Sequence, residues 1–398
     1  MNIILAPDSF KGSLTSLDAA RCMRQGLLRV FPQARVTDIP IADGGEGTVP
    51  VLLHAVGGEV RETVVMGPLG RPVAARWGLL AGGETAVIEM AAASGLPLVP
   101  ELQRDPLAAT TWGAGELVRA ALAAGVRKII LGLGGSATND GGSGLIRALG
   151  AKFLDGRGRE LPLGGAALAD LASIDLTGLD PRLQEVEILV ASDVDNPLCG
   201  PQGATAVFGP QKGATPEMVV ELDRALARYA QVARDATGKD VAALPGAGAA
   251  GGSGAGLLFF TPAVLRAGVA IVLETAGFEG HLAAADLVIT GEGRTDSQTV
   301  RGKAPVGVAR LARRYGVPVV CISGGLGEGA ALLYEEGVEG LVSCAPGPLS
   351  LEEALNQAPR LLTDATERAC RLIRIGMDLG RGLKPGHPTS GSMPKKSR

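Results

Sequence analysis

Short apolar strands alternate with amphipathic helices at both ends of this chain but not in its middle. The expected strands are residues 2–6, 35–41, 287–290, 318–323 and 340–344. The expected helices that follow them are residues 16–30, 47–56, 305–315, 329–336 and 351–375. Parallel strands need a crossover between them, and helices supply it here. Five such units predict an α/β fold with one parallel, five-stranded, flavodoxin-like sheet built from both chain ends.

The middle of the chain reads differently from about residue 62. Residues 62–80 favour two strands around the turn at 67–70, which is an antiparallel hairpin and not another parallel unit. Later features are a strand before Gly134, a hairpin turn at 155–158, a strand at 187–191 and a long helix at 216–236. We therefore expect a discontinuous flavodoxin-like domain (1–62 and 285–375), an inserted α/β domain (63–284) and a disordered tail (376–398).

Composition narrows the class of protein. With 46% hydrophobic residues among 398, the chain can bury at least two cores. A net charge of −3 and only 3% aromatic residues provide neither a basic field nor stacking surfaces for nucleic acid. The uncharged stretch 241–265 is too rich in glycine and proline for a membrane helix. Five scattered cysteines indicate a reducing compartment. We expect a cytoplasmic enzyme without a nucleic-acid or membrane partner, and the oligomeric state stays open.

Five loops at the ends of apolar strands combine small residues with acidic or amide side chains. They are residues 6–13, 42–48, 134–142, 191–197 and 290–297. Ligands of open α/β sheets bind outside the carboxyl ends of the strands, so these loops should converge in space. In the glycine-rich loop 134–142, exposed backbone amides and the start of the next helix favour the binding of an anion. Asn139 and Asp140 add oxygens that can bind metal. We expect one crowded site for a polyanion.

Taken in order, these segments resemble the bacterial glycerate kinase family. The resemblance rests on residues 6–12, 43–48, 134–142, 193–197, 209–213 and 290–296. It extends from residue 1 to about 375 and implies a flavodoxin-like domain interrupted by an inserted domain. It also implies Mg²⁺-dependent transfer of the γ-phosphoryl group of ATP to a hydroxyl of D-glycerate, with 2-phosphoglycerate as the product.

Phosphoryl transfer needs charge neutralisation, positioning and an acceptor for the hydroxyl proton. The three histidines lie in an apolar helix, before an apolar run and in the tail, so none is placed for catalysis and we expect a carboxylate as the base. Asp193, at the end of an apolar strand, is the expected base or metal ligand, while Asp195 and Asn196 shape the turn before Pro197. Simple turn capping is the alternative interpretation of these residues.

The remaining candidates are carboxylates and cations in the same loops. Glu292 and Asp296, in a loop with Arg294, are expected to bind Mg²⁺ together with Asp193. Lys11, flanked by glycine, joins Asp193 and Asp296 as a catalytic candidate. The expected substrate- and phosphate-binding residues are Asp8, Ser9, Gly134, Gly135, Ser136, Asn139, Lys212 and Arg294. A solvated turn or a surface lysine is the plain alternative for these positions, and Asp43 or Glu46 could equally cap a helix.

Two other functions fit parts of the pattern. Residues 132–137 match a loose dinucleotide fingerprint, and Asp155 falls near the position of a ribose-binding acid, as in a nicotinamide-dependent dehydrogenase. However, Asp155 and Gly156 read as a hairpin turn, whereas the fingerprint needs a parallel strand there. A non-catalytic sensor of sugar acids or nucleotides could use the same cleft, although abundant loop carboxylates would weaken a pure anion binder. A turnover assay separates the three.

Overall fold

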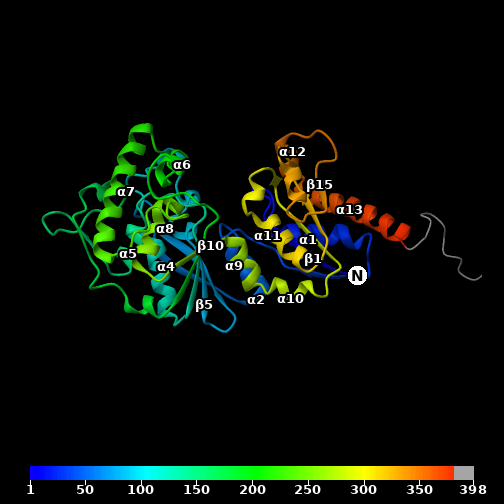
Figure 1. The fold of residues 1–398 in the computed structure, drawn as a ribbon, viewed down its shortest axis with the longest axis horizontal. Coiled ribbons are helices and arrows are strands. Elements are labelled where there is room, and N and C mark those ends of the chain that lie inside the picture. The colour runs from blue at the N-terminus through cyan, green and yellow to red at the C-terminus, as the bar shows by residue number, and fades with distance from the viewer. Residues whose placement is uncertain (381–398) are drawn as a thin grey trace, which may run out of the picture.

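The protein contains two lobes, each built on its own β-sheet (Figure 1). The structure, a computed structural model, describes residues 1–380. In the first sheet the strand order is β15-β13-β11-β1-β2, and all neighbours are parallel. Its strands are β1 (Asn2–Pro7), β2 (Arg35–Asp38), β11 (Leu287–Gly291), β13 (Val319–Ser323) and β15 (Gly340–Ser343). This order is that of a flavodoxin-like sheet, so the predicted fold class is confirmed.

The second sheet is mixed, with the order β10-β9-β6-β5-β4-β3. Its strands are β3 (Gly58–Met66), β4 (Pro72–Leu80), β5 (Thr85–Glu89), β6 (Lys128–Gly132), β9 (Glu187–Ala191) and β10 (Val264–Arg266). Strands β5, β6, β9 and β10 are parallel, whereas β3 and β4 form the predicted antiparallel hairpin. The hairpin begins at Gly58, earlier than residue 62, because Gly58 already pairs with Leu80. The exact limits of the two domains remain a proposal.

Helices cover both sheets. Those of the first lobe are α1 (Ser16–Leu28), α11 (Ala304–Arg314), α12 (Leu351–Asn356) and α13 (Ala358–Gly380). Those of the second lobe are α3 (Ala91–Ser94), α4 (Trp112–Ala123), α5 (Ser143–Ala148), α6 (Ala204–Phe208), α7 (Pro216–Thr237) and α8 (Ala249–Phe260). None of the helices within residues 1–380 is long and apolar enough to cross a membrane.

Two short segments differ from expectation, the helix at 329–336 and the start of the predicted tail. The helix expected at 329–336 is a single 3₁₀ segment, Ala330–Tyr334. The uncharged stretch 241–265 contains the buried helix α8, whose first turn is broken by left-handed backbone at 250–252. The tail predicted from residue 376 is helical as far as Gly380, and residues 381–398 lie outside the described part.

The apolar strands of the first sheet divide their side chains between two cores. Ile3 and Leu5 of β1 join a core with α1 and α13 on the outer face, while Ile4 faces the other way. Because both faces of this parallel sheet are covered, its strands appear in the sequence as continuous apolar runs. Each fully buried aliphatic side chain contributes roughly 1.5–3 kcal/mol of transfer free energy.

The core on the inner face is shared by the two lobes. It contains Ile4 and Val288 from the first sheet together with Ile130 and Leu189 from the second. Helices α2 (Thr48–Val56), α9 (Gly268–Thr275) and α10 (Phe278–Leu282) supply much of its remainder, and Figure 1 shows α2 and α9 between the lobes. The two lobes are therefore joined by packed apolar side chains as well as by the chain itself.

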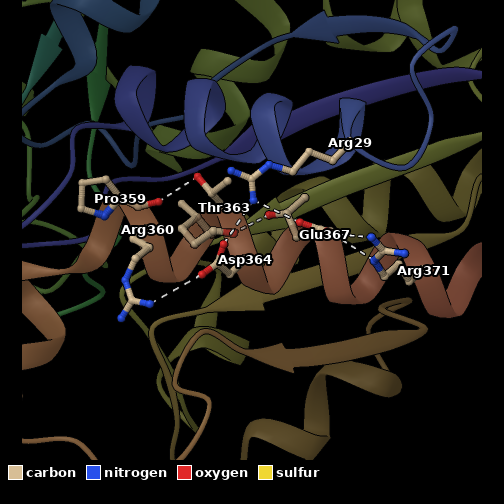
Figure 2. A network of polar contacts seen from close by, with 9 residues as sticks. Arg29, Pro359, Arg360, Thr363, Asp364, Glu367 and Arg371 are labelled. Carbon is tan, nitrogen blue, oxygen red and sulfur yellow. Dashed lines mark hydrogen bonds and ion pairs between the residues drawn. The ribbon is translucent and has the colours of Figure 1, made fainter.

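Helices α1 and α13 pack closely on the outer face of the first sheet (Figure 2). A Cβ atom at Gly26 would lie 2.2 Å from the carbonyl oxygen of Thr363, so only glycine allows this approach. Arg29 at the end of α1 bridges Asp364 and Glu367, at 3.3 and 3.1 Å. Exposed ion pairs of this kind contribute about 0.2–1 kcal/mol each, so the buried seam of the two helices provides most of the stability.

We predict that a fragment ending at residue 284 does not fold its first lobe. Such a fragment lacks β11, β13 and β15, so β1 loses its central neighbour and the shared core loses Val288. Thermal unfolding and binding of a hydrophobic dye should show exposed apolar surface and no cooperative transition for this lobe, in contrast to the full chain. A fragment with native-like amide dispersion for residues 1–41 would contradict the discontinuous sheet.

Candidate active site

Two adjoining pockets lie at the carboxyl ends of the two sheets, and Asp43 lines both. The larger, about 370 Å³, lies where β1 and β11 end, which is the point at which the strand order of a flavodoxin-like sheet reverses. We call it the switch-point pocket. The smaller, about 210 Å³, lies over the ends of β6 and β9 and is called the glycine-loop pocket. All five predicted polar loops reach one pocket or the other, so they line two adjoining pockets and not the single site that the sequence predicted.

The charged end of the switch-point pocket contains Asp8, Asp43 and Glu292. Asp8 follows β1 and is only 8% exposed; its Oδ1 accepts a hydrogen bond from the backbone amide of Ser9 at 2.6 Å. Burial, followed by the negative charge of Asp43, raises the pKa of Asp8 to about 7. The surroundings of Asp8 therefore stabilise its charged form less well than water does.

Glu292 is positioned by hydroxyl groups of its own loop. The Oε1 atom accepts hydrogen bonds from Thr299 at 2.7 Å and Thr295 at 3.0 Å, and the carboxylate is 5% exposed. Lys303 lies 3.8 Å from Oε2. Burial raises the pKa of Glu292, whereas these hydrogen bonds and Lys303 lower it. The hydroxyl groups thus hold Oε1, while Oε2 lies on the side of Lys303.

Cations and an apolar surface complete this pocket. Lys11 and Arg294 are exposed on its rim, and Lys303 is half-buried. The Nε atom of Arg294 lies 3.2 Å from Oδ2 of Asp296. The apolar wall comes from Phe10 and from α12 and α13, and consists of Phe10, Leu351, Ala354, Leu355, Ala358 and Leu361. One pocket therefore joins a set of charges suited to phosphates with a surface suited to a flat apolar ring.

Backbone contact between two glycine loops forms the floor of the glycine-loop pocket. A Cβ atom at Gly134 would lie 2.7 Å from the Cα atom of Gly45, and one at Gly132 would lie 2.1 Å from the oxygen of Gly44. Gly135 adopts a left-handed conformation with φ of 73°. The exposed backbone of Gly134 and Gly135 lines the pocket as predicted.

Asp193 lies on one side of this pocket, just beyond β9. Its Oδ1 accepts a hydrogen bond from the amide of Gly268 at 2.9 Å, at the start of α9. Partial desolvation of the carboxylate, followed by repulsion from Asp43, raises the pKa of Asp193 to about 7. The residue remains exposed on its pocket side, so water moderates that shift.

Lys212 lies on the other side and is 2% exposed. Its Nζ donates hydrogen bonds to Ser136 Oγ at 3.1 Å and to the carbonyl oxygen of Thr138 at 2.6 Å. Burial lowers the pKa of Lys212 to about 7, and the more distant Asp140 opposes that shift. The predicted residues Lys212 and Ser136 thus lie together in one pocket.

The second half of the glycine-rich loop is structural. The buried Asp140 carboxylate accepts hydrogen bonds from the amides of Thr111, Gly142 and Gly144 at 2.9, 3.1 and 3.2 Å. The N-terminus of α5 is therefore occupied by the protein's own carboxylate, which corrects the expectation of an anion site and of a metal-binding Asp140 there. Asn139 is fully buried, donates to Thr205 Oγ1 at 2.9 Å and lines neither pocket.

Asp43 is the site residue that the sequence left undecided. The expected helix cap is instead supplied by Glu89, whose Oε1 accepts hydrogen bonds from the amides of Gly47 and Val49 at 3.1 and 2.8 Å. Asp43 forms only a local bond, from the amide of Gly45 at 3.0 Å, and faces both pockets. Glu89 lies about forty residues away in the chain, so local spacing could not show that Asp43 is free for function.

The expected metal set is not brought together. Asp193 lines the glycine-loop pocket, Glu292 lines the switch-point pocket, and Asp296 lines neither. Asp296 instead accepts from the amide of Gln298 at 2.9 Å and pairs with Arg294. Within residues 1–380, no three acidic, histidine or cysteine side chains are grouped as a metal site. Lys303, missed by the sequence analysis, follows the predicted loop and precedes the Ala-Pro start of α11.

Comparison with known proteins supports this reading of the loops. The model of the glycerate kinase family matches residues 3–374. The chain is 52% identical to a glycerate kinase of Bacillus subtilis over 96% of this chain and 99% of that protein. It is 47% identical to the glycerate 2-kinase of Escherichia coli, over 95% and 99% of the two chains. The crystal structure of a protein assigned as glycerate kinase 2 from Salmonella typhimurium aligns with a TM-score of 0.86 and 49% identity, covering 95% and 99%. The chain therefore belongs to the glycerate kinase family.

Proposed function

We propose that this protein transfers the γ-phosphoryl group of ATP to D-glycerate and releases 2-phosphoglycerate. The observation that carries this proposal is the meeting of two unequal pockets at Asp43. The larger offers cations and an apolar wall, and the smaller offers Asp193 and Lys212 beside the backbone of Gly134 and Gly135. Two substrates can therefore approach one another from opposite sides of a single carboxylate. The 2-phosphoglycerate product rests on the family resemblance and on the E. coli relative.

In this proposal the cations of the switch-point pocket bind the phosphates. Lys11 and Arg294 are exposed on the rim, where they can neutralise the negative charge of a polyphosphate. Asp193 accepts the proton of the reacting hydroxyl. One of its oxygens is held by Gly268, which orients the carboxylate, and its raised pKa of about 7 suits a general base near neutral pH.

The carboxylates of the switch-point pocket fit a divalent cation. Asp8, Asp43 and Glu292 share one pocket, and the negative charges of Asp43 and Glu292 help to raise the pKa of Asp8. Mg²⁺ is usually held by only one or two carboxylates together with water and substrate phosphates, so a closed metal cage is not needed. When bound, Mg²⁺ would neutralise charge on the transferring phosphate. We assign Asp8, with Glu292 or Asp43 as a second carboxylate, to hold it, in place of the set that the sequence predicted.

The two other functions lose their basis. Asp155, the expected ribose acid of a dehydrogenase, forms a turn in which its Oδ1 accepts from the amides of Arg157 and Arg159, at 2.8 and 2.9 Å. No parallel strand precedes it, because β7 (Lys152–Leu154) pairs antiparallel with β8 (Ser173–Asp175). Membership of a kinase family also disfavours a sensor without turnover. All five cysteines are free thiols, which supports the proposed cytoplasmic location.

We expect the purified protein to consume ATP only when D-glycerate and Mg²⁺ are both present. Phosphorus NMR of the reaction mixture, with no mutase added, should show 2-phosphoglycerate and ADP. Omission of glycerate controls for simple ATP hydrolysis. Reduction of NAD with glycerate would contradict the kinase assignment, and a signal of 3-phosphoglycerate alone would overturn the proposed product.

Asp193→Asn should lower kcat by roughly 10²–10⁴, the usual contribution of a positioned base, with little change in thermal stability. A base must be deprotonated to act, so kcat of the unchanged enzyme should rise with pH through the pKa of about 7. The matched control is Asp195→Asn, which alters an exposed carboxylate two residues away that lines neither pocket. If Asp193 only shapes the turn, its variant should instead lose stability and keep activity.

Asp8→Asn should stabilise the metal-free protein at high pH. Burial raises the pKa of Asp8 from its ordinary value of 3.8 to about 7, so the carboxyl group lowers stability progressively as pH rises from about 4 to about 7. Removing that charge should raise the free energy of unfolding at pH 8 by roughly 2–4 kcal/mol, with almost no effect at pH 4. Denaturant unfolding at both pH values measures this.

The same variant tests the metal assignment. Mg²⁺ should raise the melting temperature of the unchanged protein more than that of Asp8→Asn. Asp296→Asn is the control, because Asp296 belongs to the sequence-predicted metal set but lines neither pocket. An equal response to Mg²⁺ in Asp8→Asn and a reduced response in Asp296→Asn would reverse the assignment.

A further inference from the structure

The ammonium group of Lys212 is buried in the wall of the glycine-loop pocket without a carboxylate beside it. Both of its hydrogen-bond acceptors, Ser136 Oγ and the carbonyl oxygen of Thr138, are neutral. The lysine ion pairs within residues 1–380 are those of Lys128 and Lys303. An ammonium has three donors, so within this part of the chain one N–H is left without a protein acceptor, and the only carboxylate that acts on the charge is the more distant Asp140.

A buried ammonium without a counter-ion is unfavourable, and proteins normally pair or neutralise such a group. Burial already lowers the pKa of Lys212 to about 7, whereas a bound anion would restore the charged form. The side chain lines a pocket and is only 2% exposed. An anionic group of a ligand in this pocket would supply the partner that the protein does not.

Size identifies which substrate supplies the anion. The glycine-loop pocket measures about 210 Å³ and is enclosed by the backbone of Gly134 and Gly135 and by Ala191, Ser192 and Ala249. Pockets for larger organic ligands usually exceed about 300 Å³, and the neighbouring pocket of about 370 Å³ has the apolar wall that a nucleoside needs. A three-carbon acid fits the smaller space. We propose that Lys212 binds the carboxylate of the acceptor and selects hydroxy acids over neutral polyols.

This proposal rests on the proposed kinase function and places the reacting hydroxyl between its anchor and Asp43. Asp43 lines both pockets, and Asp193 lines the same pocket as Lys212. Held at Lys212, the acid presents its hydroxyl groups towards these two carboxylates and towards the cations of the larger pocket. The alternative partner of Lys212 is the γ-phosphate of ATP, and an acceptor without charge distinguishes the two.

The experiment compares D-glycerate with D-glyceramide, which has the same hydroxyl groups but no charge. We expect the unchanged enzyme to favour glycerate strongly in kcat/KM. Lys212→Met should reduce that preference by about 30-fold or more, through a higher KM for glycerate and an unchanged KM for ATP. If Lys212 instead binds the γ-phosphate, kcat/KM should fall equally for both acceptors and the preference should persist, which would overturn the proposal.

Two further variants keep the test decisive. Lys239→Met is the matched control, because Lys239 also donates to two carbonyl oxygens, those of Leu258 and Thr261, but lies outside both pockets. It should leave the preference unchanged. Should Lys212→Met fail to fold, Ser136→Ala removes one partner of the amine and should weaken calorimetric binding of glycerate but not of ADP. Equal weakening of both ligands would refute the assignment. Absence of glycerate turnover by the unchanged enzyme would refute the kinase function instead.

Discussion

The contact between two glycine-containing loops determines where the active site can form. The loop after Ile41 inserts between the two sheets, where Gly44 would place a Cβ atom 2.5 Å from that of Ala191, and Gly268 would place one 1.9 Å from the oxygen of Asp43. Any side chain at these positions would push the lobes apart. Because the backbones touch, Asp43 lies at the junction of both pockets, and residues from two separate sheets can act on one reaction.

The positions of the buried charged side chains determine the electrostatics of the two pockets. Asp8 and Glu292 are buried near one another on one side, and Lys212 is buried on the other, with no direct pairing between them. Pairing them would satisfy the charges without a ligand and would fill the space that substrates need. Each pocket therefore combines charges of both signs: Asp193 with Lys212 in the smaller, and Asp8 and Glu292 with Lys11, Arg294 and Lys303 in the larger. Substrate binding then supplies charged partners for the buried groups, so we expect the empty site to be less stable than the occupied one.

Sequence patterns predicted the features that depend on local or periodic information. Continuous apolar runs located the parallel strands, and the polar loops after them contain the pocket-lining residues Asp8, Lys11 and Asp193. Patterns failed where long-range contacts decide. The position of Asp140 in a glycine-rich loop suggested a functional residue, but its carboxylate accepts hydrogen bonds from Thr111, 29 residues away, and has a structural role. Glu89 similarly takes the capping role expected of Asp43. The apolar wall of α12 and α13 carries no polar signal, so composition could not connect it with the site.

The shared core limits how this site can exclude water during the reaction. Closure of the two lobes as rigid bodies would have to slide packed side chains such as Ile4, Ile130 and Leu189 past one another, and a close-packed interior resists such displacement. The segment that follows β11 is also fixed in place, because Arg294 and Thr295 pair in parallel with Gly325 and Leu326. Hydroxyl groups of the same segment donate hydrogen bonds to Glu292. The packed lobes and this paired segment therefore keep the two pockets in register.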